Sequence, residues 1–359
     1  MEKLKEGSVL WEDLERIAAS DLIDWEMLNG KTVLVTGATG LIGGLFARAL
    51  VWAGMRRGLN IRVLAVVRSR EKAERVFERD FFEYGLELVT GDILEPLAVE
   101  EPVDYILHAA SMTASKDFVD RPVETILITL KGTEHMLELA RSKQVAGMVY
   151  VSSMEIYGVV EPDKYNVRET DYGYIDPLAV RSSYSEGKRM AEGLCGAYAH
   201  EYGVPVKTAR LAQTFGAGIS RNEGRVFAQF AHSIMDGTDI VLHTDGSKAH
   251  CYCYTSDAVL GLLTVLLRGN SGEAYNISNA ETFGTIRGMA EMLIAKYPES
   301  GSKLVFDIPE DSLRFGYAPT SRMLVNPEKL NALGWKAQIG LPEMFERLMR
   351  CMREWECGK

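Results

Sequence analysis

The chain is organised around residues 32–43, which read TVLVTGATGLIG. Five apolar or β-branched residues predict a short buried strand, which turns through glycines into an apolar stretch that predicts a helix. The glycines are Gly37, Gly40 and Gly43, spaced G-x-x-G-x-x-G. Gly37 permits a tight turn, Gly40 lets the backbone approach a pyrophosphate, and Gly43 lets the helix pack closely on the strand. In this strand–turn–helix context, the run predicts a dinucleotide-binding site.

Strand-like and helix-like segments alternate after this turn. The expected strands are 61–67, 86–90, 105–109, 147–152 and 206–209, and the expected helices are 45–52, 71–82, 125–142 and 184–202. Such alternation predicts an α/β fold with a doubly wound parallel (Rossmann) sheet and right-handed crossovers.

Three parts of the chain are expected. Residues 1–30 carry a loosely helical apolar pattern and predict a helical N-terminal extension. Residues 31–211 are expected to form the NAD(P)-binding domain with the catalytic residues. After residue 211 the alternation breaks up into shorter segments, including helices at 226–236, 259–267, 283–296 and 342–356. We therefore expect 212–359 to form a smaller C-terminal α/β lobe that binds substrate, with some elements crossing between the two parts.

Composition and charge narrow the function classes. Among 359 residues, 50 Asp and Glu outnumber 40 Lys and Arg, a net charge of −10. Such a chain lacks the positive field of a protein that holds nucleic acid or an anionic membrane, and no apolar run reaches the ~18 residues of a spanning helix. Without a signal-peptide pattern or a disulfide framework, a cytoplasmic protein with reduced thiols is expected. Cys251 and Cys253 lack further ligands at metal spacing, so no metal site is expected.

A tyrosine and a lysine four residues apart predict a proton-transfer pair. Tyr184 and Lys188 lie in an expected helix, where positions i and i+4 share a face. A phenol with a pKa of ~10 is a poor base at neutral pH, but a nearby ammonium and a cationic nicotinamide favour the phenolate. A shift of about three units corresponds to about 4 kcal/mol. Ser153 and Glu155 follow the end of an expected strand. Ser153 is expected to hydrogen-bond the substrate oxygen, and Glu155 is either an acid/base for the carbon skeleton of a sugar or a charge on a surface loop.

Further cofactor contacts are expected at the ends of neighbouring strands. Arg68 stands where NAD sites normally carry an acidic residue, so it favours the 2′-phosphate of NADP, with adenine stacking or exposure to solvent as alternatives. Asp92 is well placed to meet the adenine, and His108 to pack beneath the cofactor. The expected cofactor-binding residues are Gly37, Thr39, Gly40, Leu41, Ile42, Gly43, Arg68, Asp92, Ile93, His108, Ala109, Ala110, Tyr184 and Lys188.

These motifs together resemble those of the extended short-chain dehydrogenase/reductases, and more narrowly of the NAD-dependent nucleotide-sugar epimerases and dehydratases. The resemblance runs from about Lys31 to the C-terminus and rests on the glycine turn, HAA at 108–110, SS at 152–153, YG at 157–158 and YSEGKRMAE at 184–192. It implies a Ser153–Tyr184–Lys188 triad, NAD as cofactor with NADP possible, and a nucleoside-diphosphate sugar bound between the lobes. It also implies a homodimer and a role in making surface-polysaccharide precursors.

The resemblance further implies a catalytic cycle and helps to choose among its branches. Tyr184 takes a proton from a sugar hydroxyl while hydride passes to nicotinamide, giving a 4-keto sugar that is epimerised, dehydrated or decarboxylated. Family 4,6-dehydratases usually carry Asp-Glu where this chain has Met154-Glu155, and Met cannot protonate a leaving hydroxyl. Residues 181–189 are similar to the corresponding segment of UDP-glucuronate decarboxylases. An epimerase or a decarboxylase is therefore the expected activity.

Two departures from the family pattern leave the substrate contacts less clearly marked. The chain has Thr129 where the family carries Asn, and His250 at or near a position where it carries Arg for the diphosphate. Other basic candidates are expected to compensate. The candidate substrate-binding residues are Lys116, Ser152, Arg221, Arg225, Lys248, His250 and Arg322.

Two other functions compete with this interpretation. An NADP-dependent carbonyl reductase that releases its cofactor is suggested by Arg68. A non-catalytic dinucleotide sensor is disfavoured, because Ser153, Tyr184 and Lys188 are all present.

Overall fold

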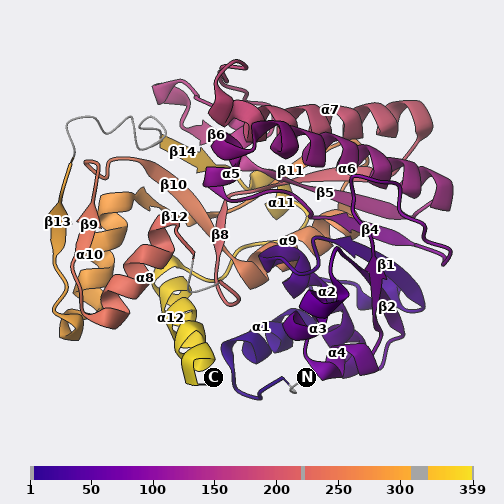
Figure 1. The fold of residues 1–359 in the computed structure, drawn as a ribbon, viewed down its shortest axis with the longest axis horizontal. Coiled ribbons are helices and arrows are strands. Elements are labelled where there is room, and N and C mark those ends of the chain that lie inside the picture. Colours follow the sequence, from indigo (N-terminus) through magenta and orange to yellow (C-terminus); the bar gives the residue numbers. More distant parts are fainter. Residues whose placement is uncertain (1–3, 220–222, 309–321, 358–359) are drawn as a thin grey trace.

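The computed structural model describes residues 4–219, 223–308 and 322–357, and a seven-stranded sheet forms its centre (Figure 1). The strands lie in the order β11-β7-β5-β4-β1-β2-β3, and all neighbouring pairs are parallel. Their bounds are β1 Lys31–Thr36, β2 Ile61–Val67, β3 Leu86–Thr90, β4 Tyr105–His108, β5 Gly147–Ser153, β7 Val206–Leu211 and β11 Ala274–Ile277. The chain reverses its direction of winding between β1 and β4, which opens a ligand-binding crevice at the carboxyl ends of these strands. The expected doubly wound sheet is confirmed.

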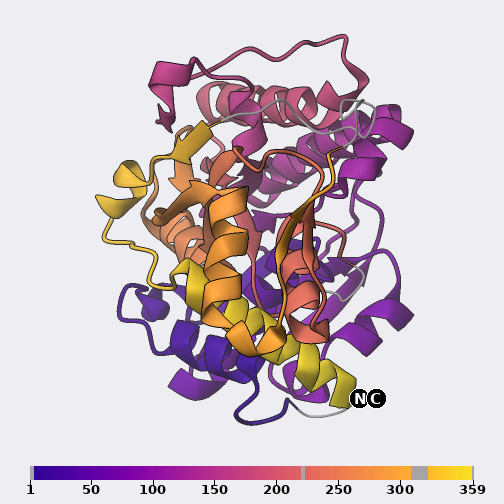
Figure 2. The ribbon, with the colours of Figure 1, turned by 90° about the vertical axis from the view of Figure 1, so that its left-hand side faces the viewer.

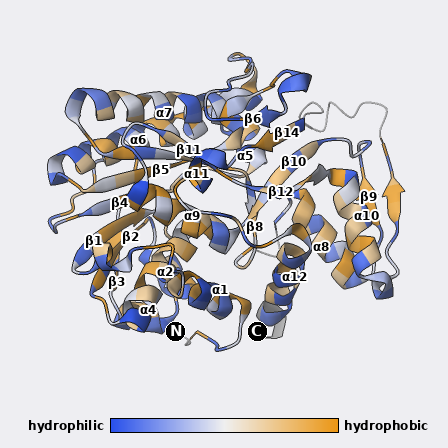
Figure 3. Cartoon of the chain, turned by 180° about the vertical axis from the view of Figure 1, so that it is seen from behind, coloured by the Kyte–Doolittle hydropathy of each residue, from blue (hydrophilic) through white to orange (hydrophobic). Residues whose placement is uncertain are grey.

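Helices cover both faces of this sheet (Figure 1). One layer contains α5 Ser115–Asp120, α6 Pro122–Lys143 and α7 Ser183–Tyr202, and the other contains α1 Val9–Ala18, α2 Leu41–Arg57 and α9 Thr255–Arg268. Alternate residues of β1 enter different cores, with Val33 and Val35 on the side of α2 and Leu34 on the side of α6. Figure 3 shows the resulting hydrophobic interior between helices whose outer faces are more hydrophilic.

Three expected helices have different bounds. α2 is longer than 45–52, because Gly40 caps its start and Gly58, with a φ of 68°, closes its end in the left-handed conformation. The expected helix 71–82 is divided into α3 Arg70–Val76 and α4 Arg79–Glu83, since Phe77 has extended backbone and buries its ring. The expected helix 283–296 begins only at Ile286, where the Thr285 side chain caps α10.

The remaining elements form a smaller lobe, seen from the side in Figure 2. Its main sheet has the order β12-β10-β14-β6, with β8 paired to β10, and a separate pair joins β13 to β9. The strands are β6 Asn166–Val167, β8 Gln213–Phe215, β9 Ile240–Leu242, β10 Ala249–Tyr254, β12 Asn279–Thr285, β13 Leu304–Phe306 and β14 Arg322–Val325, and the helices are α8 Val226–Asp236, α10 Ile286–Lys296 and α12 Leu341–Cys357. The short helix α11 Glu328–Asn331 packs instead on β11 of the large sheet. The two parts exchange elements, because β11 returns to the large sheet and β6 joins the small one.

Short 3-10 turns link several of these elements. They are η1 Trp25–Leu28, η2 Met154–Tyr157, η3 Pro162–Lys164, η4 Val180–Ser182 and η5 Pro298–Ser300. Of the helices in the described ranges, none combines the length and the apolar character needed to cross a membrane.

The N-terminal helix α1 is bonded to later parts of the chain. Asp13 is fully buried and accepts a hydrogen bond of 2.8 Å from the Tyr254 hydroxyl. Arg16 donates to Ser256 at 2.6 Å and forms an ion pair with Asp257, at the start of α9. Figures 1 and 2 both place α1 beside α12. This helix is therefore part of the protein core.

Candidate active site

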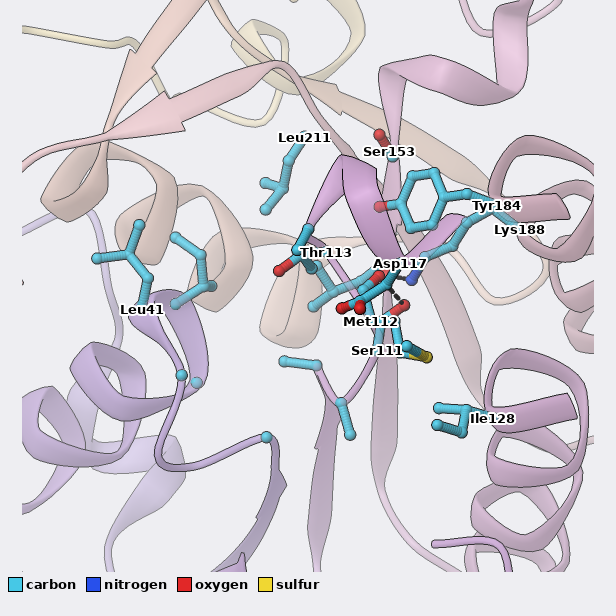
Figure 4. A pocket seen from close by; sticks show the side chains of 18 of the residues that line it. Leu41, Ser111, Met112, Thr113, Asp117, Ile128, Ser153, Tyr184, Lys188 and Leu211 are labelled. Carbon is cyan, nitrogen blue, oxygen red and sulfur yellow. Dashed lines mark hydrogen bonds between the residues drawn. The ribbon is translucent and has the colours of Figure 1, made fainter. Parts of the chain in front are cut away.

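A cavity of about 550 Å³ lies at the carboxyl ends of β1, β2, β4 and β5. It runs from the glycine turn to the first residues of α7, and Figure 4 shows Leu41 on one side with Ser153, Tyr184 and Lys188 on the other. Many of the residues expected from the sequence line it: Gly37, Thr39, Gly40, Leu41, Ile42, Gly43, Arg68, Asp92, Ile93, Ala109, Ala110, Ser152, Ser153, Glu155, Tyr184, Lys188 and Arg225. Residues far apart in the sequence thus meet in one hollow.

The glycine turn is too tight for side chains. Gly37 has a φ of +67°, and a Cβ there would lie 2.8 Å from the backbone of Ala109. A Cβ on Gly43 would lie 2.5 Å from the carbonyl oxygen of Gly37. Gly40 caps the N-terminus of α2, where free backbone N–H groups and the helix dipole favour an anion. The residues present therefore fit the pyrophosphate of a dinucleotide.

His108 lies beside this turn in a single tautomer. Thr36 Oγ1 lies 2.7 Å from His108 Nδ1 and accepts the backbone N–H groups of Ala109 and Ala110, each at 3.2 Å. A hydroxyl has one proton and two lone pairs, so this proton goes to Nδ1 and the neutral ring carries its hydrogen on Nε2. Within the described chain, Nε2 is buried without a hydrogen-bond partner. Burial and the charge of Lys188 lower the pKa of His108 to about 3.

Tyr184 and Lys188 project from one side of α7 towards the end of β5. Lys188 Nζ donates a hydrogen bond of 2.7 Å to the carbonyl oxygen of Val151 and lies 5.8 Å from the centre of the Tyr184 ring. Burial lowers the pKa of Lys188 to about 7, although Glu192 opposes the shift. Burial also raises the pKa of Tyr184, while the Ser153 side chain lowers it. The surroundings of Tyr184 in the chain alone therefore do not favour the phenolate. The expected phenolate also depends on the positive charge of a bound nicotinamide ring.

Phe118 packs against the ring of Tyr184. The rings of Phe118 and Tyr184 are stacked, with centroids 4.3 Å apart and planes at 11°. Phe118 is almost completely buried, so the stack restricts the rotation of Tyr184. Sequence reasoning missed this residue, because a stacking partner on a separate helix leaves no local signal.

Glu155 faces the cavity as one half of an ion pair. Its Oε2 and Oε1 accept hydrogen bonds of 3.0 and 3.1 Å from Nη1 and Nη2 of Arg181. Ser185 Oγ lies 3.4 Å from Glu155 Oε2. Arg181 also lies over the Phe118 ring, at 4.8 Å from its centre. The expected acid/base residue is thus already bound to a guanidinium.

Ser152 points to a buried network instead of offering a free hydroxyl. Its Oγ donates a hydrogen bond of 2.5 Å to Glu192 Oε1. Arg210 Nη2 pairs with Glu192 Oε2 at 2.7 Å and also donates to the Tyr172 hydroxyl, while Arg210 Nη1 donates to the Tyr157 hydroxyl. Ser152 lies at the cavity wall, but its hydroxyl serves to link β5 to α7.

The structure does not bring all candidate substrate residues to the cavity. Lys116 lies on the outer side of α5, where its side chain is 87% exposed and pairs with Asp120. Arg322 stacks over Tyr165 and Phe283. Neither residue is among those that line the cavity, so their roles in substrate binding stay predictions.

The other basic candidates have varied surroundings. His250 is buried within β10, and its Nδ1 has no partner in the described chain; it stands outside the set of residues lining the cavity. Arg225 lines the cavity and pairs with Glu223 at 2.7 Å. Lys248 is half-buried and interacts electrostatically with Glu155. Arg221 lies outside the described residues.

Comparison with known proteins identifies the family. The model of the NAD dependent epimerase/dehydratase family matches residues 33–278, from β1 to β11. The chain belongs to this family. UDP-glucuronic acid decarboxylase 1 from Danio rerio is 31% identical over 322 residues, which cover 89% of this chain and 72% of that relative.

Solved structures of the epimerase/dehydratase family share the fold. An epimerase from Methanothermobacter thermautotrophicus is 26% identical, with a TM-score of 0.79 over 94% of this chain and 96% of that one. A UDP-glucuronic acid 4-epimerase from Bacillus cereus, solved with UDP-glucuronic acid and NAD, is 17% identical, with a TM-score of 0.71 over 90% of this chain and 99% of that one. These findings confirm an NAD-dependent enzyme of the nucleotide-sugar epimerase, dehydratase and decarboxylase group.

Proposed function

We propose that this enzyme decarboxylates UDP-glucuronic acid through a 4-keto intermediate, giving a UDP-pentose and CO₂. The observation that carries the proposal is one cavity lined by the glycine turn, by Ser153, Tyr184 and Lys188, and by Glu155 next to Met154. The decarboxylase relative supports the choice of substrate. The product is a sugar donor of the kind used for surface polysaccharides, which the family resemblance implies.

Tyr184, Lys188 and Ser153 would act on the C-4 hydroxyl of the sugar. Tyr184 takes the hydroxyl proton, Ser153 hydrogen-bonds the same oxygen, and Lys188 holds the cofactor ribose and stabilises the phenolate. The glycine turn would hold NAD, whose nicotinamide, when bound, accepts the C-4 hydride, later returns it, and supplies positive charge near Tyr184. Burial raises the pKa of Tyr184, so the phenolate needs the positive charge of the bound cofactor.

Oxidation at C-4 makes the rest of the reaction chemically favourable. The C-4 carbonyl is then β to the carboxylate, so the C-5–C-6 bond breaks, CO₂ leaves, and the electron pair forms an enolate stabilised at the C-4 oxygen. Glu155 lies on the cavity wall, where as a general acid/base it can direct the protonation of C-5. Met154 has no proton to give to a leaving C-6 hydroxyl, which disfavours dehydration.

Product analysis tests this proposal. The purified holoenzyme is incubated with UDP-glucuronic acid, UDP-glucose or dTDP-glucose, and the products are followed by proton NMR. We expect only UDP-glucuronic acid to be consumed, to give a UDP-pentose without net formation of NADH. Conversion of UDP-glucose or dTDP-glucose, with UDP-glucuronic acid untouched, would contradict the proposal.

C-4 epimerisation is the second candidate function, favoured by the likeness to the Methanothermobacter epimerase at 26% identity. In that case the 4-keto sugar rotates and is reduced on its opposite face. The carbon count of the product distinguishes the two reactions, because an epimerase retains C-6.

The family resemblance also leads us to propose a homodimer formed through helices α6 and α7. Val123, Leu127 and Met190 are exposed hydrophobic residues on these helices, which supports such a contact. Light scattering of the purified protein at micromolar concentration should give twice the chain mass of 39.9 kDa. A monomer mass would contradict a homodimer.

A further inference from the structure

The ion pair between Glu155 and Arg181 suggests a role for Arg181 in substrate selection. Of the two residues, Glu155 lines the cavity, and Arg181 donates two hydrogen bonds to its carboxylate. The Arg181 side chain is 34% exposed and that of Glu155 is 27% exposed. Because the pair is bidentate and only partly exposed, it opens less readily than a surface ion pair, and an incoming carboxylate has to replace both hydrogen bonds of Glu155.

The surrounding charges leave Glu155 outnumbered by cations. Arg181 forms an ion pair with Glu155, and Lys248 interacts electrostatically with both of them. Arg225 already pairs with Glu223 and is balanced. The group of Glu155, Arg181 and Lys248 therefore carries one positive charge in excess. A second carboxylate that reaches these three residues would meet a net positive charge, although Asp117 on α5 also lines the cavity.

We infer that Arg181 exchanges partners when substrate binds, releasing Glu155 and binding the carboxylate carried by the sugar. The guanidinium fork pairs with any carboxylate in the same two-point geometry, so a sugar carboxylate can take the position of Glu155. Phe118 supports the flat guanidinium at 4.8 Å while its partner changes. The inference rests on the proposed function, since it concerns a sugar with a carboxylate.

The exchange has two consequences. First, a neutral sugar offers no replacement for Glu155, so Arg181 favours acidic sugars over neutral ones. Second, Glu155 becomes free only when an acidic sugar has arrived, which makes its acid/base role conditional on the correct substrate. A purely structural Arg181 would orient Glu155 and treat acidic and neutral sugars alike.

Equilibrium binding tests the exchange. Holoenzyme carrying Tyr184→Phe, which prevents turnover, is titrated with UDP-glucuronic acid and with UDP-glucose by calorimetry. Adding Arg181→Met should weaken UDP-glucuronic acid binding about tenfold and leave UDP-glucose within about twofold, because a buried charge pair with the ligand is lost. Arg181→Lys should recover part of the affinity. Arg75→Met, an exposed arginine of α3, is the matched control and should change neither.

Removing the charge of Glu155, which competes with the sugar carboxylate for Arg181, should change the affinity in the opposite direction. Glu155→Gln should tighten UDP-glucuronic acid binding, and this gain should disappear when Arg181→Met is also present. Equal weakening of both sugars by Arg181→Met, or weaker UDP-glucuronic acid binding in Glu155→Gln, would overturn the exchange. Failure of the proposed function is separate, since it would appear as absent CO₂ release in the wild-type enzyme whether or not binding is selective.

Discussion

Thr36 Oγ1 lies 2.7 Å from His108 Nδ1, which joins the end of β1 to the end of β4. In the sheet register, Thr36 pairs with His108 and His108 pairs with Tyr150. The centres of the Tyr150 and His108 rings lie 5.8 Å apart, and Lys188 Nζ lies 4.7 Å from the centre of the Tyr150 ring. One row of side chains thus connects the glycine turn with Lys188.

This row predicts that His108 remains neutral well below neutral pH. Its folded pKa of about 3 lies below the ordinary 6.5, so only the unfolded chain takes up this proton between those values. The stability due to the neutral ring is present above the unfolded pKa and is lost as the pH falls towards the folded pKa. Between pH 6.5 and 4.5, the free energy of unfolding should fall by about 2 kcal/mol from this group.

The variant His108→Asn tests this acid sensitivity. Asn keeps an acceptor for Thr36 but does not titrate, so its urea-unfolding free energy should depend less on pH over that range. His200→Asn, an exposed change on α7, should keep the wild-type pH dependence. An unchanged acid loss in His108→Asn would refute the assignment, and nitrogen NMR of wild-type His108 should show hydrogen on Nε2.

Arg68 should distinguish NADP from NAD. It lines the cavity at the end of β2, where a 2′-phosphate would gain a charge-assisted hydrogen bond. Arg68→Ala should weaken NADP binding about tenfold and NAD binding less than about twofold, by fluorescence titration. Arg70→Ala, whose arginine pairs with Glu74 on α3, is the control. Equal losses for the two cofactors would remove Arg68 from the 2′-phosphate.

Phe118 should affect turnover more than binding. Loss of the stacked ring in Phe118→Leu frees Tyr184 to rotate, and such pairs contribute about 0.5–1.5 kcal/mol, so kcat should fall about threefold to tenfold. KM and the NAD dissociation constant should change little. Phe82→Leu removes a ring from α4, distant from Tyr184 in the sequence, and should leave kcat unchanged. If Phe118→Leu raised KM alone, the stack would serve binding and not proton transfer.

Breaking the buried ion pair between Arg210 and Glu192 should lower the free energy of unfolding. Arg210 is almost fully buried and bonds Glu192 through both Nε and Nη2. Arg210→Met should lower the free energy of unfolding by about 3–5 kcal/mol, because Glu192 remains buried without its counter-charge. Arg210→Met combined with Glu192→Leu should regain part of this loss in urea titrations. Equal or greater destabilisation in the double variant would contradict this explanation.

The sequence predicted the parts of the site that are local and missed those that join distant elements. The glycine turn and the pair Tyr184–Lys188 each lie within one strand–turn–helix or one helix, so spacing alone places their side chains. Stacking of Phe118 on Tyr184 joins α5 to α7, and no spacing reveals it. Lys116 lies outside the cavity lining for a related reason, since the sequence of a short helix does not reveal which of its faces borders the cavity.

The fate of C-6 of the sugar is the most direct test of the proposed reaction. The holoenzyme is given UDP-glucuronic acid labelled with ¹³C at the carboxylate, and carbon NMR follows the label, with Tyr184→Phe as the inactive control. We predict that the label leaves as CO₂ and bicarbonate at the rate at which UDP-pentose forms. Retention of the label in a UDP-hexuronic acid, whether unchanged or epimerised at C-4, would contradict decarboxylation.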